Sequence, residues 1–297
     1  MNEEQPDESI AIEFRNVSLS FDDKPALTDV SFQLARGEMI FITGVSGSGK
    51  SVLLHLAMGL LKPDAGQILV KRREIDTMEE SDLLALRGGL MGMVFQEDSL
   101  FSGLTVYENA AYRLVDHGWS EEEIERAVGE VLRFVGLAAE EAKLPEELSG
   151  GMKRRLEIAR ALIGWPSIML FDEPTMGLDP IVAVQVLDLI IRARDVNKVS
   201  SLFVTKKLYE LPYLANYRAV PGDEIAITEA PRDQLPRTRI MVLDQGRIAF
   251  SGSLADFQNS KSPLIEELFV RDHRDHSADP YYPDPWDKRR RPKEEIL

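Results

Sequence analysis

The sequence predicts an α/β domain built on a mainly parallel sheet, and three observations carry this prediction. Short apolar segments typical of buried strands alternate with helical segments along most of the chain. A glycine-rich loop over 44–51 joins one such strand to a helix. Two carboxylates, Asp172 and Glu173, follow another apolar strand directly, at the end where open α/β sheets bind ligands.

The first elements are defined by apolar alternation and by turn residues. Apolar side chains alternate over 12–19, which predicts a strand, and 26–34 is a second strand-like segment. The run 39–43 is continuously apolar and bounded by glycine, as a buried parallel strand is. The elements expected next are a helix over 51–61, ended by Lys-Pro-Asp-Ala-Gly at 62–66, and strands over 67–70 and 90–95.

The later elements continue this alternation. Ser120 and the three glutamates after it favour the positive end of a helix, so a helix is expected over 120–135. Further helices are expected over 105–115, 151–163 and 181–194, strands over 168–171 and 201–205, and a hairpin over 239–250. The expected division is a disordered lead over 1–10, one domain over 11–258 and a C-terminal extension over 259–297.

Two parts of that domain stand out. A helical subdomain is expected over about 97–165, and residues 207–238, rich in proline and charge, are expected to form an irregular insertion. Residues from 271 onward are charged and contain four prolines, which predicts an extended tail.

Composition excludes several classes of function. With 35 basic and 50 acidic side chains the net charge is −15, which argues against a general nucleic-acid binder, because phosphate contacts need a surplus of Lys and Arg. The absence of cysteine excludes disulfides, zinc–thiolate sites and cysteine nucleophiles. The sequence contains no apolar run of roughly 18 residues, so no membrane span is predicted. The acidic N-terminus does not resemble a secretory signal.

The loop after the third strand fits the phosphate-binding pattern G-x-x-x-x-G-K-[ST]. Its glycines let backbone N–H groups turn inward around an anion, and the following helix adds its positive end. Lys50 is expected to reach the outer phosphates and the Ser51 hydroxyl to ligate magnesium. The candidate nucleotide-binding residues here are Gly44, Val45, Ser46, Gly47, Ser48, Gly49, Lys50, Ser51 and Val52.

The carboxylates at the end of the strand over 168–171 complete this chemistry. Asp172 is expected to hold magnesium directly or through water, and Glu173 to orient or deprotonate an attacking water. A solvated Asp-Glu pair is the alternative, and the phosphate loop in the same chain favours the catalytic interpretation.

The segment Leu-Ser-Gly-Gly-Met-Lys-Arg-Arg at 148–155 resembles the signature motif of ATP-binding cassette (ABC) proteins, and other motifs follow in that family's order. Those matches are Phe21 for the aromatic that stacks on adenine, Gln96 for the Q-loop glutamine, Asp172 and Glu173 for the Walker B aspartate and catalytic glutamate, and Asp179 for the D-loop. The resemblance is close over 12–206 and looser over 238–252.

This resemblance implies a P-loop ATPase fold with a parallel core sheet, an antiparallel β edge and a helical subdomain, and it implies ATP and Mg²⁺ as ligands. A serine and two glycines at a helix start form a second anion cradle. The family's arrangement is a head-to-tail dimer, with each ATP between the phosphate loop of one copy and Ser149, Gly150 and Gly151 of the other. The implied metal ligands are Ser51, Gln96 and Asp172, and the implied dimer contacts are Ser149, Gly151 and Asp179.

Finer features resemble the ATPases of Mla/Mce lipid-transport systems, namely the segments 95–101, 104–109, 144–148 and 150–155. This implies a membrane permease dimer, a lipid-carrier partner, a phospholipid or sterol-like cargo, and a peripheral position on the cytoplasmic face of the inner membrane. Asp98, Ser99, Leu100 and Phe101 match the surface that contacts the permease, with a core or turn role as the alternative. An ABC importer for another small solute, and a soluble ABC ATPase acting in repair or translation, remain alternatives.

The sequence departs from the family at Lys206. The family places a histidine after the strand that follows Walker B, whereas this chain has Val-Thr-Lys-Lys at 204–207. Protonated lysine only donates hydrogen bonds, so Lys206 can neutralise the γ-phosphate but cannot accept a hydrogen bond from an attacking water. Two hypotheses follow: hydrolysis with Glu173 as base, or a nucleotide-gated assembly that hydrolyses little.

Overall fold

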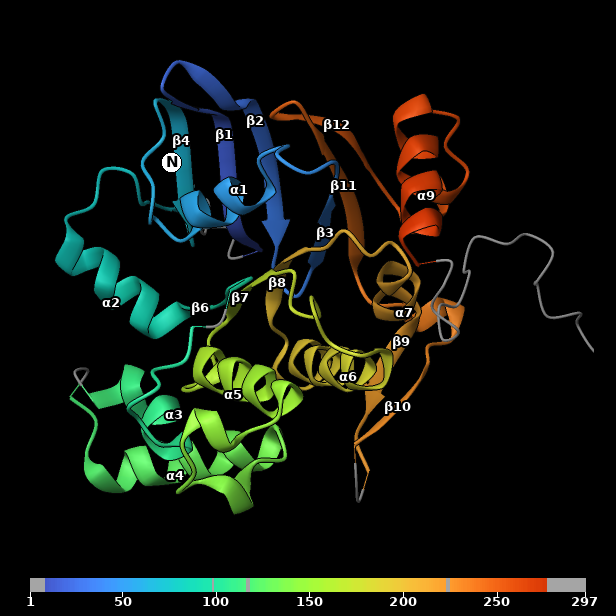
Figure 1. Cartoon of the computed structure of the whole chain (residues 1–297). Coiled ribbons are helices and arrows are strands. Elements are labelled where there is room, and N and C mark those ends of the chain that lie inside the picture. The colour runs from blue at the N-terminus through green and yellow to red at the C-terminus, as the bar shows by residue number, and fades with distance from the viewer. Residues whose placement is uncertain (1–8, 98, 116–117, 223–224, 277–297) are drawn as a thin grey trace, which may run out of the picture.

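A six-stranded sheet forms the centre of the protein. The computed structural model describes residues 9–97, 99–115, 118–222 and 225–276. The strand order is β12-β11-β3-β8-β7-β6, and all neighbours are parallel except the β11–β12 hairpin (Figure 1). The strands are β3 (Met39–Thr43), β6 (Met91–Val94), β7 (Ile168–Asp172), β8 (Ser200–Val204), β11 (Thr238–Asp244) and β12 (Arg247–Gly252). The predicted mainly parallel sheet is therefore confirmed.

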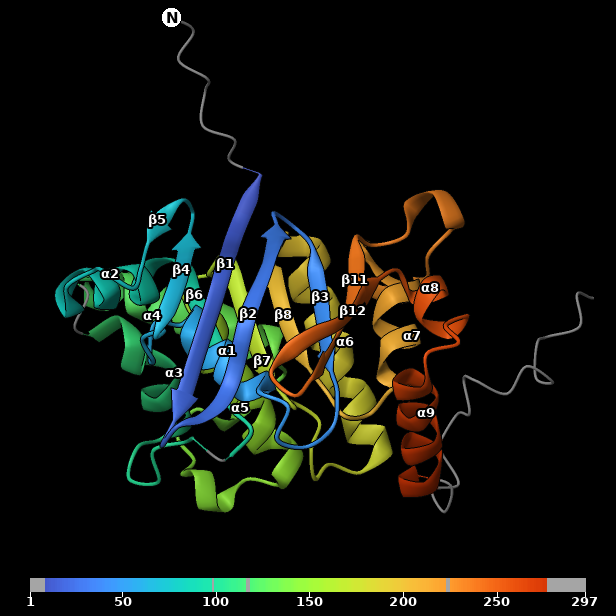
Figure 2. The ribbon, with the colours of Figure 1, turned by 90° about the horizontal axis from the view of Figure 1, so that it is seen from above.

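A second, antiparallel sheet lies over one face of the first (Figure 2). Its strands, in spatial order, are β2 (Lys24–Ala35), β1 (Ile10–Phe21), β4 (Ala65–Val70) and β5 (Arg73–Glu74). Helix α1 (Lys50–Ala57) contacts strands of both sheets and lies between them. The predicted antiparallel edge is this sheet, and β1 begins at Ile10, inside the segment that was expected to be a disordered lead.

The core has two layers, because successive side chains of a strand face opposite sides of its sheet. On β3, Ile40 and Ile42 pack with α1 and the antiparallel sheet. Met39 and Phe41 pack on the other side with the helical subdomain and with α6 (Pro180–Asn197). A strand buried on both faces must be continuously apolar, which is why the sequence identified it.

The helical subdomain contains α3 (Val106–Val115), α4 (Glu121–Phe134) and α5 (Gly150–Leu162). The expected start of α4 is confirmed by a capping box, in which Ser120 and Glu123 each bond the other's backbone N–H. A further helix, α2 (Glu80–Leu90), precedes β6 and was not predicted. No helix in the described ranges has the length and apolarity needed to cross a membrane.

The expectation that 207–238 is irregular was wrong. This segment contains α7 (Glu210–Asn216) and a hairpin of β9 (Tyr217–Val220) and β10 (Ala226–Glu229). Pro212 lies in the first turn of α7, where backbone N–H groups have no helical partner and a proline costs little. Proline content therefore misidentified a helix start as a loop.

The prediction of an extended tail from residue 271 was wrong for its first residues, which are helical. After α8 (Leu254–Gln258), helix α9 (Pro263–His276) continues beyond residue 271. Ile265 and Leu268 are buried, and Asp272 accepts a hydrogen bond of 2.8 Å from the backbone N–H of Leu208. Burial of one apolar face orders this segment despite its charge. Residues 1–8 and 277–297 of the predicted lead and tail lie outside the described residues.

Candidate nucleotide-binding site

The phosphate loop turns between β3 and α1 at positions where only glycine fits. Gly44 has φ 142°, and a Cβ atom there would lie 2.1 Å from the Leu243 carbonyl oxygen. Gly49, before the first residue of α1, has φ 100°, and its Cβ would lie 2.6 Å from the Ala26 carbonyl oxygen. Both contacts are with backbone atoms, so any side chain would displace the loop.

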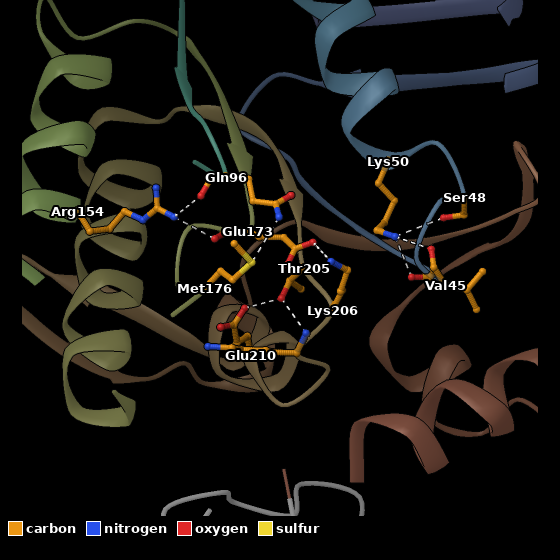
Figure 3. A network of polar contacts seen from close by, with 12 residues as sticks. Val45, Ser48, Lys50, Gln96, Arg154, Glu173, Met176, Thr205, Lys206 and Glu210 are labelled. Carbon is orange, nitrogen blue, oxygen red and sulfur yellow. Dashed lines mark hydrogen bonds and ion pairs between the residues drawn. The ribbon is translucent and has the colours of Figure 1, made fainter. Parts of the chain in front are cut away.

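Lys50 is held under this loop. Its Nζ donates hydrogen bonds to the carbonyl oxygens of Gly44 (2.9 Å) and Val45 (2.8 Å), and it lies 3.4 Å from the Ser48 Oγ (Figure 3). Burial lowers the pKa of Lys50 to about 8, and the positive charge of Lys206 acts in the same direction. An anion entering the loop would restore the charged form.

Asp172 and Ser51 offer a site that fits a divalent cation. Asp172 is 3% exposed, and its Oδ1 has no hydrogen-bond partner among the described residues. Burial raises the pKa of Asp172, while a hydrogen bond with the Ser51 side chain lowers it. A buried carboxylate oxygen without a partner, beside a hydroxyl, matches the oxygen ligands that Mg²⁺ prefers.

Glu173 and Lys206 form an ion pair at the same edge of the sheet. They follow the neighbouring parallel strands β7 and β8, and Lys206 Nζ lies 2.6 Å from Glu173 Oε1. Glu173 is 8% exposed and has a left-handed backbone, with φ 47°, whereas the Lys206 side chain is 45% exposed. The pair thus joins an almost buried carboxylate to a cation that reaches solvent.

A cavity of about 310 Å³ opens beside this edge. It is lined by ten of the predicted residues, Phe21, Ser46, Gly47, Gly49, Lys50, Ser51, Val52, Gln96, Glu173 and Lys206, and by Ala26. The structure therefore brings together the predicted phosphate loop, adenine contact, Q-loop and catalytic residues. Val45 and Ser48 contact Lys50 from the loop itself, and Asp172 lies next to Ser51.

The signature residues do not line this cavity. Ser149 caps α5 by accepting from the Met152 N–H, and Ser149 and Gly150 are exposed. Gly151 packs against α6 so closely that a Cβ would lie 2.5 Å from Val182 Cγ1. Asp179 caps α6 by accepting from the Val182 N–H. These residues thus gather at the starts of two adjacent helices.

Sequence reasoning missed the contacts that join these parts. Arg154, buried on α5, donates to the carbonyl oxygens of Phe95 (2.8 Å), Gln96 (3.4 Å) and Glu173 (3.3 Å). Arg154 also forms an ion pair of 2.6 Å with Oε2 of Glu157. The other carboxylate oxygen of Glu157 accepts a hydrogen bond from the Ser99 N–H. An Arg and a Glu three residues apart within a helix were the available signal. The helix that follows the signature is thereby tied to both the Q-loop and the Walker B loop.

A second missed residue is Glu210 on α7. It is fully buried and accepts hydrogen bonds from the hydroxyls of Thr175 and Thr205, one on each of the loops after β7 and β8. Lys207 adds a bond of 2.9 Å from Nζ to the Thr175 carbonyl oxygen. Because α7 was expected to be irregular, nothing in the sequence placed this carboxylate between the two loops.

Comparison with known proteins identifies the family. Residues 27–176, about half of the chain, match the profile of the family described as ABC transporter. The chain belongs to the ABC transporter family. This membership confirms the predicted fold and the predicted enzyme class, an ATPase that uses ATP and Mg²⁺.

Several ABC relatives extend the similarity over most of the chain. A chloroplastic Arabidopsis thaliana protein named TRIGALACTOSYLDIACYLGLYCEROL 3 is 35% identical over 88% of this chain and 74% of its own. A methionine import ATP-binding protein, MetN, of Leifsonia xyli is 38% identical over 74% of this chain and 64% of its own length, just under two thirds. MetN of Carboxydothermus hydrogenoformans is 33% identical over 86% and 70%.

A solved structure supports the same conclusion. An ATP-binding cassette captured as a dimer in a post-hydrolysis state with ADP and Pi is 26% identical, with a TM-score of 0.68. The match covers 82% of this chain and 98% of that one.

We expect nucleotide binding to take up a proton near pH 8. Without nucleotide, a fraction of the molecules has a neutral Lys50 at that pH, because its pKa is about 8. The negative phosphate raises the pKa of Lys50, so binding favours the protonated form. At about pH 6 Lys50 is already charged and uptake at this site disappears. Calorimetry of ADP binding in buffers with different ionisation heats measures this uptake. The control is Lys50→Arg, which stays charged; equal uptake by both proteins would contradict the assignment.

Proposed function

We propose that this chain is the ATP-hydrolysing subunit of an ABC transporter and that two copies bind two ATP molecules between them. The observation that carries the proposal is the cavity, which gathers Lys50, Gln96, Glu173 and Lys206 around one phosphate loop. All of these side chains have functional groups suited to a triphosphate and an attacking water.

Each site residue has a proposed role. The phosphate loop and Lys50 hold the phosphates, and Phe21, exposed at the end of β1, stacks on the adenine. Ser51, Asp172 and Gln96 would hold Mg²⁺, which neutralises phosphate charge when bound. Glu173 accepts the proton of the water that attacks the γ-phosphorus, while the bond to the bridging oxygen breaks and ADP leaves.

The second half of each site comes from a second copy. Ser149 and Gly150 lie exposed at the start of α5, outside the cavity of their own chain. A helix start with exposed N–H groups suits the outer phosphates of ATP held by a partner. The dimeric, ADP- and Pi-bound cassette of the same fold supports this arrangement and favours hydrolysis over a binding-only module.

The permease contact is proposed for an apolar groove beside the Q-loop. This groove, of about 370 Å³, lies among α2, β6, α3 and α5, and includes Leu84, Phe95, Phe101 and Tyr112. Leu84 and Tyr112 are half-exposed and lie with Phe95 and Phe101 in one apolar groove, and a contiguous exposed apolar patch is typical of a partner surface. Ser99 and Phe101 of the predicted permease surface line it; Asp98 lies outside the described residues.

For the cargo, the comparisons favour import of a small solute over the expected lipid. Several relatives are methionine import proteins, which supports an importer of an amino-acid-like solute. Lipid transport is the second candidate, supported by the lipid name of the Arabidopsis relative, which aligns over 88% of this chain. We therefore propose a peripheral ATPase of an importer at the cytoplasmic face of a membrane, with a lipid carrier as partner only under the second candidate.

Glu173→Gln tests the catalytic role. The amide cannot accept the water's proton, so ATP turnover should fall by roughly a hundredfold or more while ATP still binds. Phosphate release and gel filtration with Mg-ATP measure turnover and dimer formation, and the variant should accumulate as a two-copy species. Glu266→Gln, an exposed carboxylate on α9, is the matched control. Wild-type turnover by Glu173→Gln would eliminate this role.

Co-purification tests the partner and the cargo. The tagged chain should retain a multi-span permease from solubilised membranes, and Leu84→Arg should release it, because a charge in the groove is unpaired. Val270→Arg, equally exposed on α9, should not. The recovered complex in liposomes should show ATPase stimulated by methionine-like solutes. Stimulation by phospholipid alone would favour the second candidate.

A further inference from the structure

The ion pair between Lys206 and Glu173 places a cation on the carboxylate proposed as the base. A cation beside a carboxylate stabilises its charged form and so weakens it as a base, and here Oε1 lies 2.6 Å from Lys206 Nζ. We propose that Lys206 is a latch on Glu173: the ion pair keeps the carboxylate from acting as a base until the γ-phosphate of ATP attracts Lys206 away. This inference rests on the proposed function and adds a regulation of the same site.

Contacts between the two loops hold the backbones of Glu173 and Lys206 close together. The loop that carries Glu173 and the loop that carries Lys206 are joined through Glu210, which accepts from a threonine on each loop. The N–H of Glu173 also donates to the Val204 carbonyl oxygen at 3.0 Å. With both backbones fixed, forming the pair orders only the Lys206 and Glu173 side chains and costs no further backbone entropy. The almost buried carboxylate also strengthens the attraction relative to an exposed pair.

ATP supplies a competing anion at the right place. Lys206, Glu173 and Lys50 line one cavity, so the γ-phosphate enters beside the pair. Figure 3 shows the Lys206 side chain directed at Glu173. Lys206 is half-exposed on a flexible four-carbon chain, so it can turn to the phosphate. Its departure leaves the Glu173 carboxylate able to accept a proton from water. ADP lacks the γ-phosphate and leaves the latch closed.

The latch also favours the return of the site to its state before ATP binding. Once the bond from the γ-phosphorus to the bridging oxygen has broken, Lys206 can leave the phosphate product and return to Glu173. That return competes with phosphate for the same ammonium group and so favours its release. A histidine at this position, when neutral, offers Glu173 no such ion pair.

A double-mutant cycle tests the exchange. Calorimetry measures binding of a non-hydrolysable ATP analogue and of ADP, with Mg²⁺, to wild type, Lys206→Gln, Glu173→Gln and the double variant. In wild type Lys206 must leave Glu173 before it binds the analogue, whereas in Glu173→Gln it is already available. Lys206→Gln should therefore cost roughly tenfold more affinity in the Glu173→Gln background than in wild type. ADP affinity should change by no more than about twofold throughout.

The controls separate the latch from general effects. Lys206→Arg keeps the charge and should retain the coupling, and Lys261→Gln, an exposed lysine in the loop before α9, should change neither affinity. Equal losses in both backgrounds, or equal losses for ADP and analogue, would overturn the latch. If these results occur while turnover still depends on Glu173, only the latch fails. If no protein binds nucleotide, the proposed function fails with it.

Discussion

The carboxyl ends of β3, β7 and β8 meet at one edge of the parallel sheet, and the phosphate loop, the carboxylates and Lys206 are brought together by this register. β3 delivers the phosphate loop, β7 delivers Asp172 and Glu173, and β8 delivers Lys206. Neighbouring parallel strands lie about 4.8 Å apart, and β8 lies between β3 and β7, so residues that follow these three strands lie close together. The apolar strands, buried on both faces, fix that level, and the chemistry follows from it.

The parts of the site that could be predicted are those whose chemistry is contiguous in sequence. The loop ending in Lys50 and Ser51 carries its glycines, its cation and its helix in one stretch, and Asp172 and Glu173 follow directly on a recognisable strand. The parts that were missed are tertiary. Nothing near Glu210 in sequence shows that it will lie between two loops, and Arg154 contacts residues far along the chain.

The lysine at the switch position changes meaning once the structure is considered. As a sequence feature it casts doubt on hydrolysis, because an ammonium group cannot accept a hydrogen bond from water. In the structure it neutralises a nearly buried carboxylate, and membership of an ATPase family agrees with turnover. The fine resemblance to lipid-transport ATPases has weaker support, since named methionine importers lie at similar identity.

The central claim is that each ATP site is shared between two copies, and cross-linking tests it most directly. The chain contains no cysteine, so Ser149→Cys in one copy and Ser46→Cys in another introduce the only thiols. Both positions are exposed in the single chain. With a non-hydrolysable ATP analogue, a thiol reagent of roughly 10 Å reach should join the two variants into a two-chain product. Failure to form this product despite bound nucleotide would contradict the shared site.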